Sequence, residues 1–221
     1  TQEVKTRNLK KTFEDEMDER TPRDTFQHCL INAAHQFTNR SNGEAYILAG
    51  YPWFKCRARD MFISLPGLTL AIDEKAKYEE MMTTASKAIR HFINDEPSNL
   101  KVYEMEHPDV LLWAVWCIQQ YAKMVSKEEC IEKYGALLAE IMEYLCNENH
   151  PNLFLHGNGL LYTNGHDRAV TWMNSTANGR PVIPRTGYVV EINALWYNAL
   201  CFVADLLGKE EYKDLADKTG V

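Results

Sequence analysis

Six helical segments of alternating character constrain this fold more than any other feature. Three are apolar on almost every side, at about 60–71, 108–124 and 190–207. Three carry a single apolar stripe at helical spacing, at about 21–37, 73–93 and 126–146. A seventh segment begins at Lys209. Helices that are apolar all round are expected to be buried on every side, and amphipathic helices to cover them. The pattern predicts an all-α fold with an inner and an outer layer.

Local signals mark several helix ends. Thr21 followed by Pro22 predicts a helix start, with a capping hydroxyl and a proline in the first turn. Ser126 and Glu129 form a capping box, in which each side chain satisfies a backbone N–H of the other residue. Gly208 is the residue expected just after a helix C-terminus.

The connections alternate in length as well. Those near positions 73, 125 and 208 are short, whereas the others are long, at roughly 40–59, 94–107 and 147–188. Antiparallel helix hairpins with this alternation place every long loop at one end. That arrangement describes an (α/α)6 toroid. An α-solenoid could give the same pattern, although no fixed-period repeat is present.

Counting helices predicts that the ring is incomplete. Six and a fraction helices make about half of an (α/α)6 barrel. We expect a charged lead-in over 1–20, followed over 21–221 by the N-terminal portion of such a domain, truncated at its C-terminus. An unclosed ring leaves apolar inner-helix surface bare, so we also expect self-association through that edge.

Composition excludes several classes of partner. The net charge is 24 − 31 = −7 with no basic stripe, which disfavours nucleic acid. We expect no membrane span, because no apolar run approaches the required length. Six scattered cysteines without a CxxC pair predict buried, reduced thiols in a cytoplasmic protein. No histidine spacing suits a metal, and we expect neither metal nor cofactor.

The long loops are rich in aromatic and charged residues. Trp53 and Trp172 lie in two of these loops, near arginine and carboxylate side chains. Aromatic rings stack on the apolar faces of sugars, and charged groups bind sugar hydroxyls. A carbohydrate ligand is therefore favoured. The alternative is that the aromatic residues only fold the loops onto the rim.

Several strings, in order along the chain, resemble the amylo-α-1,6-glucosidase domain of glycogen debranching enzymes. They are AGYPWF at 49–54, RDMFISLPGL at 59–68, DVLLW at 109–113, GLLY at 159–162, TWMN at 171–174, PR at 184–185 and VEINALWYNAL at 190–200. The resemblance runs from about residue 25 to the end of the chain. It implies an (α/α)6 barrel that hydrolyses the α-1,6 bond of a single glucose at a glycogen branch, with inversion.

The resemblance also shows one departure. Inversion requires a carboxylic acid that protonates the leaving oxygen and a carboxylate that activates water. The family's acid is the aspartate ending TWMD, which is Asn174 here. An amide cannot supply that proton. Either the domain only binds glucan, or Asp167 or Glu191 has become the acid, or Asn174 was engineered to trap substrate.

The other site residues follow from the same motifs. By carry-over, Arg59 and Asp60 bind the terminal glucose. Trp53 and Trp172 would form the wall of its subsite, and Tyr51 and Arg185 are expected to bind substrate as well. Glu191 accepts hydrogen bonds in the pocket or holds Arg185, unless it only stabilises the start of its helix. The second carboxylate, the base, is expected beyond Val221, so this chain alone should be inactive.

Two other functions stay open on the sequence. One is a catalytically silent module that binds α-glucans such as glycogen, limit dextrin or malto-oligosaccharides, which Asn174 favours. The other is a different (α/α)6 hydrolase of glucoamylase or trehalase type. The VEINALWYNAL string argues against the second possibility, because it is typical of the debranching family.

Overall fold

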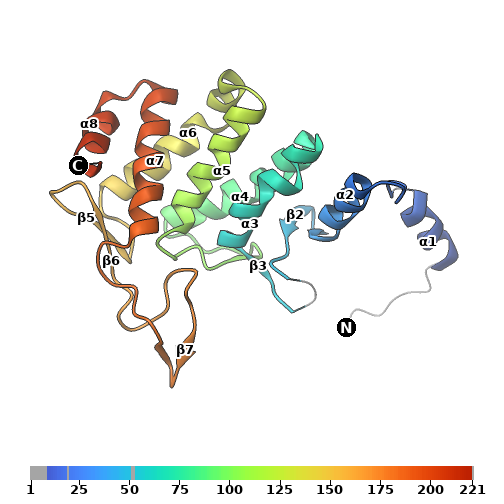
Figure 1. Cartoon of the computed structure of the whole chain (residues 1–221), viewed down its shortest axis with the longest axis horizontal. Coiled ribbons are helices and arrows are strands. Elements are labelled where there is room, and N and C mark those ends of the chain that lie inside the picture. The colour runs from blue at the N-terminus through green and yellow to red at the C-terminus, as the bar shows by residue number, and fades with distance from the viewer. Residues whose placement is uncertain (1–8, 19, 51–52, 221) are drawn as a thin grey trace.

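The computed structural model describes residues 9–18, 20–50 and 53–220. Within these ranges eight α-helices form most of the regular structure, and the strands occur only in two-stranded pairings (Figure 1). The fold is therefore all-α, as the sequence predicts.

Six helices form two layers. The inner helices are α3 (Ala58–Leu68), α5 (Val110–Met124) and α7 (Val190–Leu207). The outer helices are α4 (Lys75–Ile93), α6 (Lys127–Cys146) and α8 (Glu210–Thr219). Figure 1 shows α3, α5 and α7 in a row, and α5 contacts both of the others. The predicted alternation of inner and outer helices is present from α3 to α8, whereas the segment at 21–37, predicted as an outer helix, leaves Phe26 81% and Leu30 53% exposed. That these layers form part of an incomplete toroid stays a prediction.

The core lies between these layers. Tyr78 of α4, Tyr121 of α5 and Tyr134 of α6 pack their rings against one another, with centroids 5.1 to 6.3 Å apart. Trp196 of α7 is fully buried and donates from Nε1 to the carbonyl of Gly159 at 3.1 Å. Each such side chain contributes about 2–3 kcal/mol by burial. The core thus joins elements that are distant in sequence.

Two inner helices are not buried on every side, since Asp60 and Ile63 of α3 are exposed. Along α7, Val190 is 82% exposed and Tyr197 is 45% exposed, and Cys201 is also exposed. The expectation of complete burial was wrong for both helices. The 18 residues of α7 are also long and apolar enough, by length and composition only, to cross a membrane, which the sequence analysis did not anticipate. Here α7 packs against α5, α6 and α8.

Helix ends show where local signals were sufficient. Ser126 accepts from the N–H of Glu129 at 3.2 Å, and Gly208 ends α7 with φ of 66°. However, α2 (Phe26–Gln36) begins later than predicted, because Thr25 caps it by accepting from the N–H of His28. The lead-in also contains an unpredicted helix, α1 (Leu9–Asp18).

Short strands occupy the loops that the sequence left unassigned. One antiparallel pairing joins β1 (Thr38–Ser41) to β2 (Glu44–Ile47) through Asn42 and Gly43, both with positive φ. The other pairings are parallel β3 (Cys56–Arg57) with β4 (Val102–Tyr103), and antiparallel β5 (Leu153–Leu155) with β6 (Leu161–Thr163) and β7 (Thr176–Ala177) with β8 (Arg180–Pro181). A 3₁₀ turn, η1 (Leu70–Ile72), follows α3.

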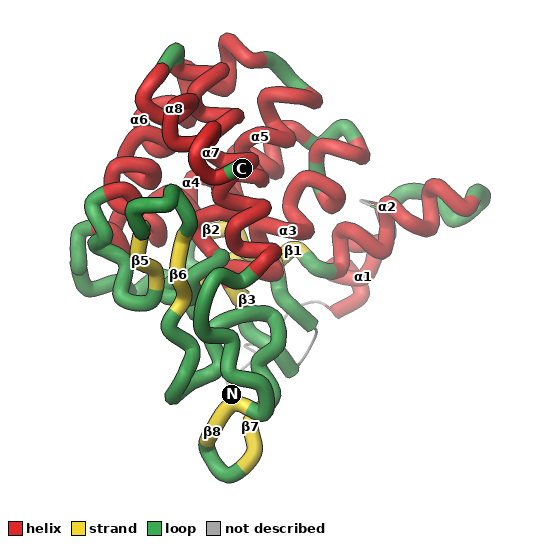
Figure 2. The backbone as a smooth tube through the Cα atoms, turned by 60° about the vertical axis from the view of Figure 1, so that its left-hand side comes forward, coloured by secondary structure: helices red, strands yellow, loops and turns green. Residues whose placement is uncertain are grey.

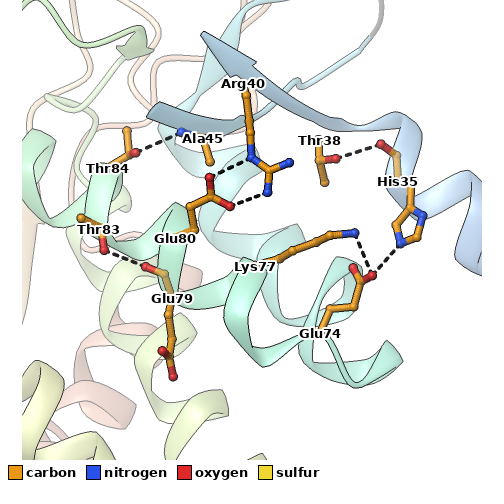
Figure 3. A network of polar contacts seen from close by, with 10 residues as sticks. All are labelled: His35, Thr38, Arg40, Ala45, Glu74, Lys77, Glu79, Glu80, Thr83 and Thr84. Atoms are coloured by element: carbon orange, nitrogen blue, oxygen red, sulfur yellow. Dashed lines mark hydrogen bonds and ion pairs between the residues drawn. The ribbon is translucent and has the colours of Figure 1, made fainter. Parts of the chain in front are cut away.

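The β1–β2 hairpin is fastened to α4 by polar contacts (Figure 3). Arg40 donates two hydrogen bonds to Glu80, at 2.8 and 2.6 Å. The N–H of Ala45 donates to Thr84 at 3.3 Å. These contacts fix the first long loop against the outer layer.

All three long connections lie at one end of the helical layers, as predicted (Figures 1 and 2). Each precedes an inner helix, so the N-termini of α3, α5 and α7 open onto this rim. A helix N-terminus carries a partial positive charge and unpaired N–H groups, which favour carboxylates there. The rim is therefore where the candidate site residues gather.

Candidate active site

The two ends of the longest rim loop are held together by backbone hydrogen bonds, which form a closed neck. Thr163 and Gly187 exchange two backbone hydrogen bonds of 2.9 Å, which bring together the ends of residues 164–186, here called the rim lobe. Inside the neck, a Cβ atom on Gly165 would lie 2.7 Å from the carbonyl oxygen of Arg185. Only glycine allows this approach, so the lobe leaves and re-enters the helical layers at one point.

Three site residues meet where the lobe joins α7. Glu191 stands in the first turn of this helix. Its Oε1 accepts from Trp172 Nε1 at 3.0 Å and also pairs with Arg185 Nη2. The Arg185 guanidinium carbon lies 5.9 Å from the centroid of the Trp172 ring, within range of a cation–π contact. The sequence left open whether Glu191 holds Arg185, and the structure shows that it does.

This Trp172–Arg185–Glu191 cluster is partly open to solvent. Trp172 is 58% exposed, so its ring is accessible to a ligand. The side chains of Arg185 and Glu191 are 22% and 37% exposed. Arg185 Nε is buried without a hydrogen-bond partner among the described residues. An accessible aromatic ring beside an arginine and a carboxylate has the chemistry that binds a sugar.

The two other candidate catalytic residues lie in the rim lobe. Asn174 is two residues beyond Trp172, and Asp167 precedes it on the same lobe. Both side chains are exposed, and neither has a hydrogen bond or ion pair within the part of the chain that the structure describes. Both are therefore accessible to a ligand that reaches the lobe.

Arg59 has protein partners instead of a free guanidinium. It donates two hydrogen bonds to Asp109, from Nε at 2.7 Å and from Nη2 at 2.9 Å. Its Nη2 also lies 3.0 Å from His107 Nδ1. The Arg59 and Asp109 side chains are only 8% and 4% exposed. Here Arg59 joins the starts of α3 and α5, a role that the sequence analysis missed.

His107 contacts this buried ion pair, and His150 lies close to His107. Burial and the charge of Arg59 lower the pKa of His107. Burial also lowers the pKa of His150 to about 4, with a smaller contribution from Arg168. Both histidines are therefore neutral near pH 7.

Asp60 lies on a different inner helix from the Trp172–Arg185–Glu191 cluster. Asp60 is exposed on α3 and lines a cavity of about 250 Å³ together with Phe37 and Ile63. Two interhelical spacings separate α3 from α7, or about 16–20 Å. Trp53 is 84% exposed, and Tyr51 lies outside the described residues.

Tyr162 and Tyr188 pack within the rim, as expected if loop aromatics only fold the loops onto it. Tyr162 and Tyr188 pack against each other edge to face, and His156 stacks on Tyr162. His156 Nδ1 and the Tyr188 hydroxyl are 2.7 Å apart. These side chains fold the rim onto itself, which leaves Trp172 as the accessible aromatic of the rim lobe.

The cysteines correct one expectation. All six are free, but Cys29 and Cys201 are exposed although their apolar helical surroundings predicted burial. Among the described residues no cluster of three or more His, Cys, Asp or Glu side chains could hold a metal ion.

The fold and this rim define an all-α domain with an exposed tryptophan beside an arginine–carboxylate pair, and a family comparison makes the assignment specific. Residues 30–219 match the family model described as amylo-alpha-1,6-glucosidase. The chain belongs to this family. Searches of curated proteins and of solved structures found no match. The family is one of glycoside hydrolases of the glycogen-debranching type, and its substrates are α-glucans.

Proposed function

We propose that the complete gene product removes an α-1,6-linked glucose from a glycogen branch point with inversion, and that this chain binds and orients the glucose. The observation that carries the proposal is the Trp172–Arg185–Glu191 cluster, which lies within the family match. The exposed Trp172 ring would stack on the apolar face of the glucose, and the Arg185 guanidinium would hold that ring in place.

Glu191 is better suited to hold Arg185 than to act as an acid. One oxygen, Oε1, already accepts from both Trp172 and Arg185. A general acid must instead donate a proton to the leaving oxygen. Asp167, which is exposed and has no protein partner among the described residues, is therefore our candidate acid in place of Asn174.

A catalytically silent glucan-binding domain is the second candidate function, and Asn174 is the observation that favours it. The neutral amide can bind a sugar hydroxyl but cannot protonate a leaving group. On either account we propose that these 221 residues alone do not hydrolyse glucan. An inverting pair needs two carboxylates about 6.5–9.5 Å apart, and Glu191 is already held by Trp172 and Arg185, which leaves Asp167 without a second catalytic carboxylate at the cluster.

The test is glucose release from a singly branched limit dextrin by the complete gene product, native and Asn174→Asp. Release by the native protein supports hydrolysis with another acid, and loss of that release in Asp167→Asn identifies the acid. Release by the Asn174→Asp variant alone supports the silent binder. If neither protein releases glucose or binds the dextrin, both functions are contradicted.

Two further proposals concern the setting of the protein. The exposed side of α7 would be covered by self-association, and a single monomeric species in sedimentation velocity would contradict this. A cytoplasmic location is proposed from the six free cysteines, and fractionation of cells that express the protein would test it.

A further inference from the structure

A second cavity lies on the rim, beside the start of α3. Three segments that are distant in sequence enclose it: the β1–β2 hairpin, residues 54–56 and residues 101–103. The parallel pairing of Cys56 with Val102 holds the second and third segments together. The cavity has a volume of about 380 Å³, which is in the range of small-molecule sites. We call it the hairpin pocket.

Two lysines give this pocket a positive charge. Lys101 donates from Nζ to Ser41 Oγ at 2.8 Å, and Lys55 Nζ lies 4.8 Å from the centroid of the Tyr103 ring. Neither ammonium group has an ion pair with a carboxylate of the described residues. By contrast, Arg40 in the same lining is paired with Glu80 (Figure 3). The net charge of the whole chain is −7, so two uncompensated lysines in one cavity indicate an anionic ligand.

Aromatic and polar groups complete the lining. Tyr103 is 40% exposed and Phe54 is 50% exposed, so each presents ring surface. Asn39 and Ser41 add an amide and a hydroxyl from β1. Rings of this kind pack against the apolar face of a sugar, while amides and hydroxyls bind its hydroxyl groups.

We propose that the hairpin pocket binds a phosphate monoester carried on a glucose unit. The ammonium groups of Lys55 and Lys101 would bind the phosphate oxygens, and Tyr103 would pack against the sugar ring. A neutral glucan would not use the two lysine charges. The choice of glucose rests on the proposed function, because the family acts on α-glucans. The ester could belong to a free sugar phosphate or to a phosphorylated glucan chain.

The pocket is suited to binding and not to covalent chemistry. Its thiol, Cys56, is buried, and burial raises the pKa of this thiol to about 12, so no thiolate is available. The pocket also lies beside α3, two helices away from Glu191 on α7. It can therefore be occupied independently of the Trp172–Arg185–Glu191 cluster.

Isothermal titration of the chain with glucose 6-phosphate tests the proposal. We expect binding that weakens about 10-fold or more in Lys55→Met/Lys101→Met, because charge-assisted hydrogen bonds are lost. The double variant Lys123→Met/Lys213→Met loses the same charge at exposed sites outside the pocket, and it should bind like the native chain. If circular dichroism shows that the pocket variant is unfolded, Lys101→Met alone provides the comparison.

Titrations with inorganic phosphate, glucose and maltoheptaose 6-phosphate test which parts of the ligand the pocket recognises. Equal affinity for inorganic phosphate and glucose 6-phosphate would overturn the proposal, because no sugar would be recognised. Equal affinity for glucose and glucose 6-phosphate would overturn it as well. Binding of maltoheptaose 6-phosphate at least about 10-fold more tightly than glucose 6-phosphate supports a glucan source, and equal binding supports a free sugar phosphate.

Neutral maltoheptaose separates this proposal from the proposed function. Its binding should be lost in Trp172→Ala and unchanged in Lys55→Met/Lys101→Met. If neutral maltoheptaose does not bind, the proposed function fails. If it binds but glucose 6-phosphate does not, only the hairpin pocket proposal fails.

Discussion

Two arginine–carboxylate pairs stand at the rim, and they differ in almost every physical respect. Arg59 and Asp109 are buried, form two parallel hydrogen bonds and join the starts of two inner helices. Arg185 and Glu191 are partly exposed and share an accessible tryptophan. The comparison teaches that the same two chemical groups serve the fold at one place and remain accessible to a ligand at the other, depending on burial.

Breaking the buried pair should give the largest effect. We expect Arg59→Met to lower the free energy of unfolding by about 3–5 kcal/mol, because it leaves the Asp109 carboxylate buried without its partner. Urea unfolding measures this change. The double variant Arg59→Met/Asp109→Leu should recover most of the loss, and Arg185→Met, at the exposed pair, should cost less than about 1 kcal/mol. Equal losses for both arginines would contradict the comparison.

Acidification should lower the free energy of unfolding through protonation of the buried His150. His150 is 2% exposed, and its pKa is about 4 in the folded protein, against an ordinary value near 6.5. Above pH 6.5 its contribution to stability is fully present, and it is lost as the pH falls towards 4. The loss should be on the order of 3 kcal/mol over this interval. We expect His150→Gln to flatten the dependence of unfolding free energy on pH.

The matched control for this experiment is His156→Gln, which changes an exposed histidine of the rim. Urea unfolding at several pH values between about 7 and about 4.5 compares the three proteins. A slope in the His150→Gln protein equal to that of the native chain would show that another group causes the acid sensitivity.

Removing the charge of the exposed pair should affect stability least and binding more. Glu191→Gln should lower the unfolding free energy by less than about 1 kcal/mol, since the Glu191 carboxylate is partly exposed and its pairing is screened by solvent. Its affinity for maltoheptaose should fall about 10-fold, because Trp172 and Arg185 lose their shared carboxylate acceptor. Titration calorimetry measures the affinity. Glu210→Gln is the control, an exposed carboxylate in the first turn of α8.

The sequence predicted the helical layers well, because their signals are local. Hydrophobic period, the Ser126 cap and the left-handed Gly208 are properties of neighbouring residues. A local signal was also available for the β1–β2 hairpin, since Asn42-Gly43 is a strong turn sequence, but it was not used. Asn178-Gly179 provides the same signal for β7 and β8.

The partners of the charged side chains could not be predicted in the same way. Asp109 lies 50 positions from Arg59, and no periodicity links them. Arg185 and Glu191 are close in sequence, and the sequence left open whether they pair. The motifs could not show that Arg59 is buried. Exposure of Cys201 was also missed, because an apolar helix pattern does not reveal which face lacks a neighbour. Long-range packing decides these features.

The closed neck of the rim lobe allows the ligand specificity of the lobe to change without a change in the packing and stability of the helices. Thr163 and Gly187 close the lobe at one point, so we expect added or altered residues near Asn178 and Gly179 to leave the register of α7 unchanged. Exposed turns of this kind accept insertions readily. Evolution or design can thus vary what the lobe recognises, while the helices below keep the same packing and the same stability.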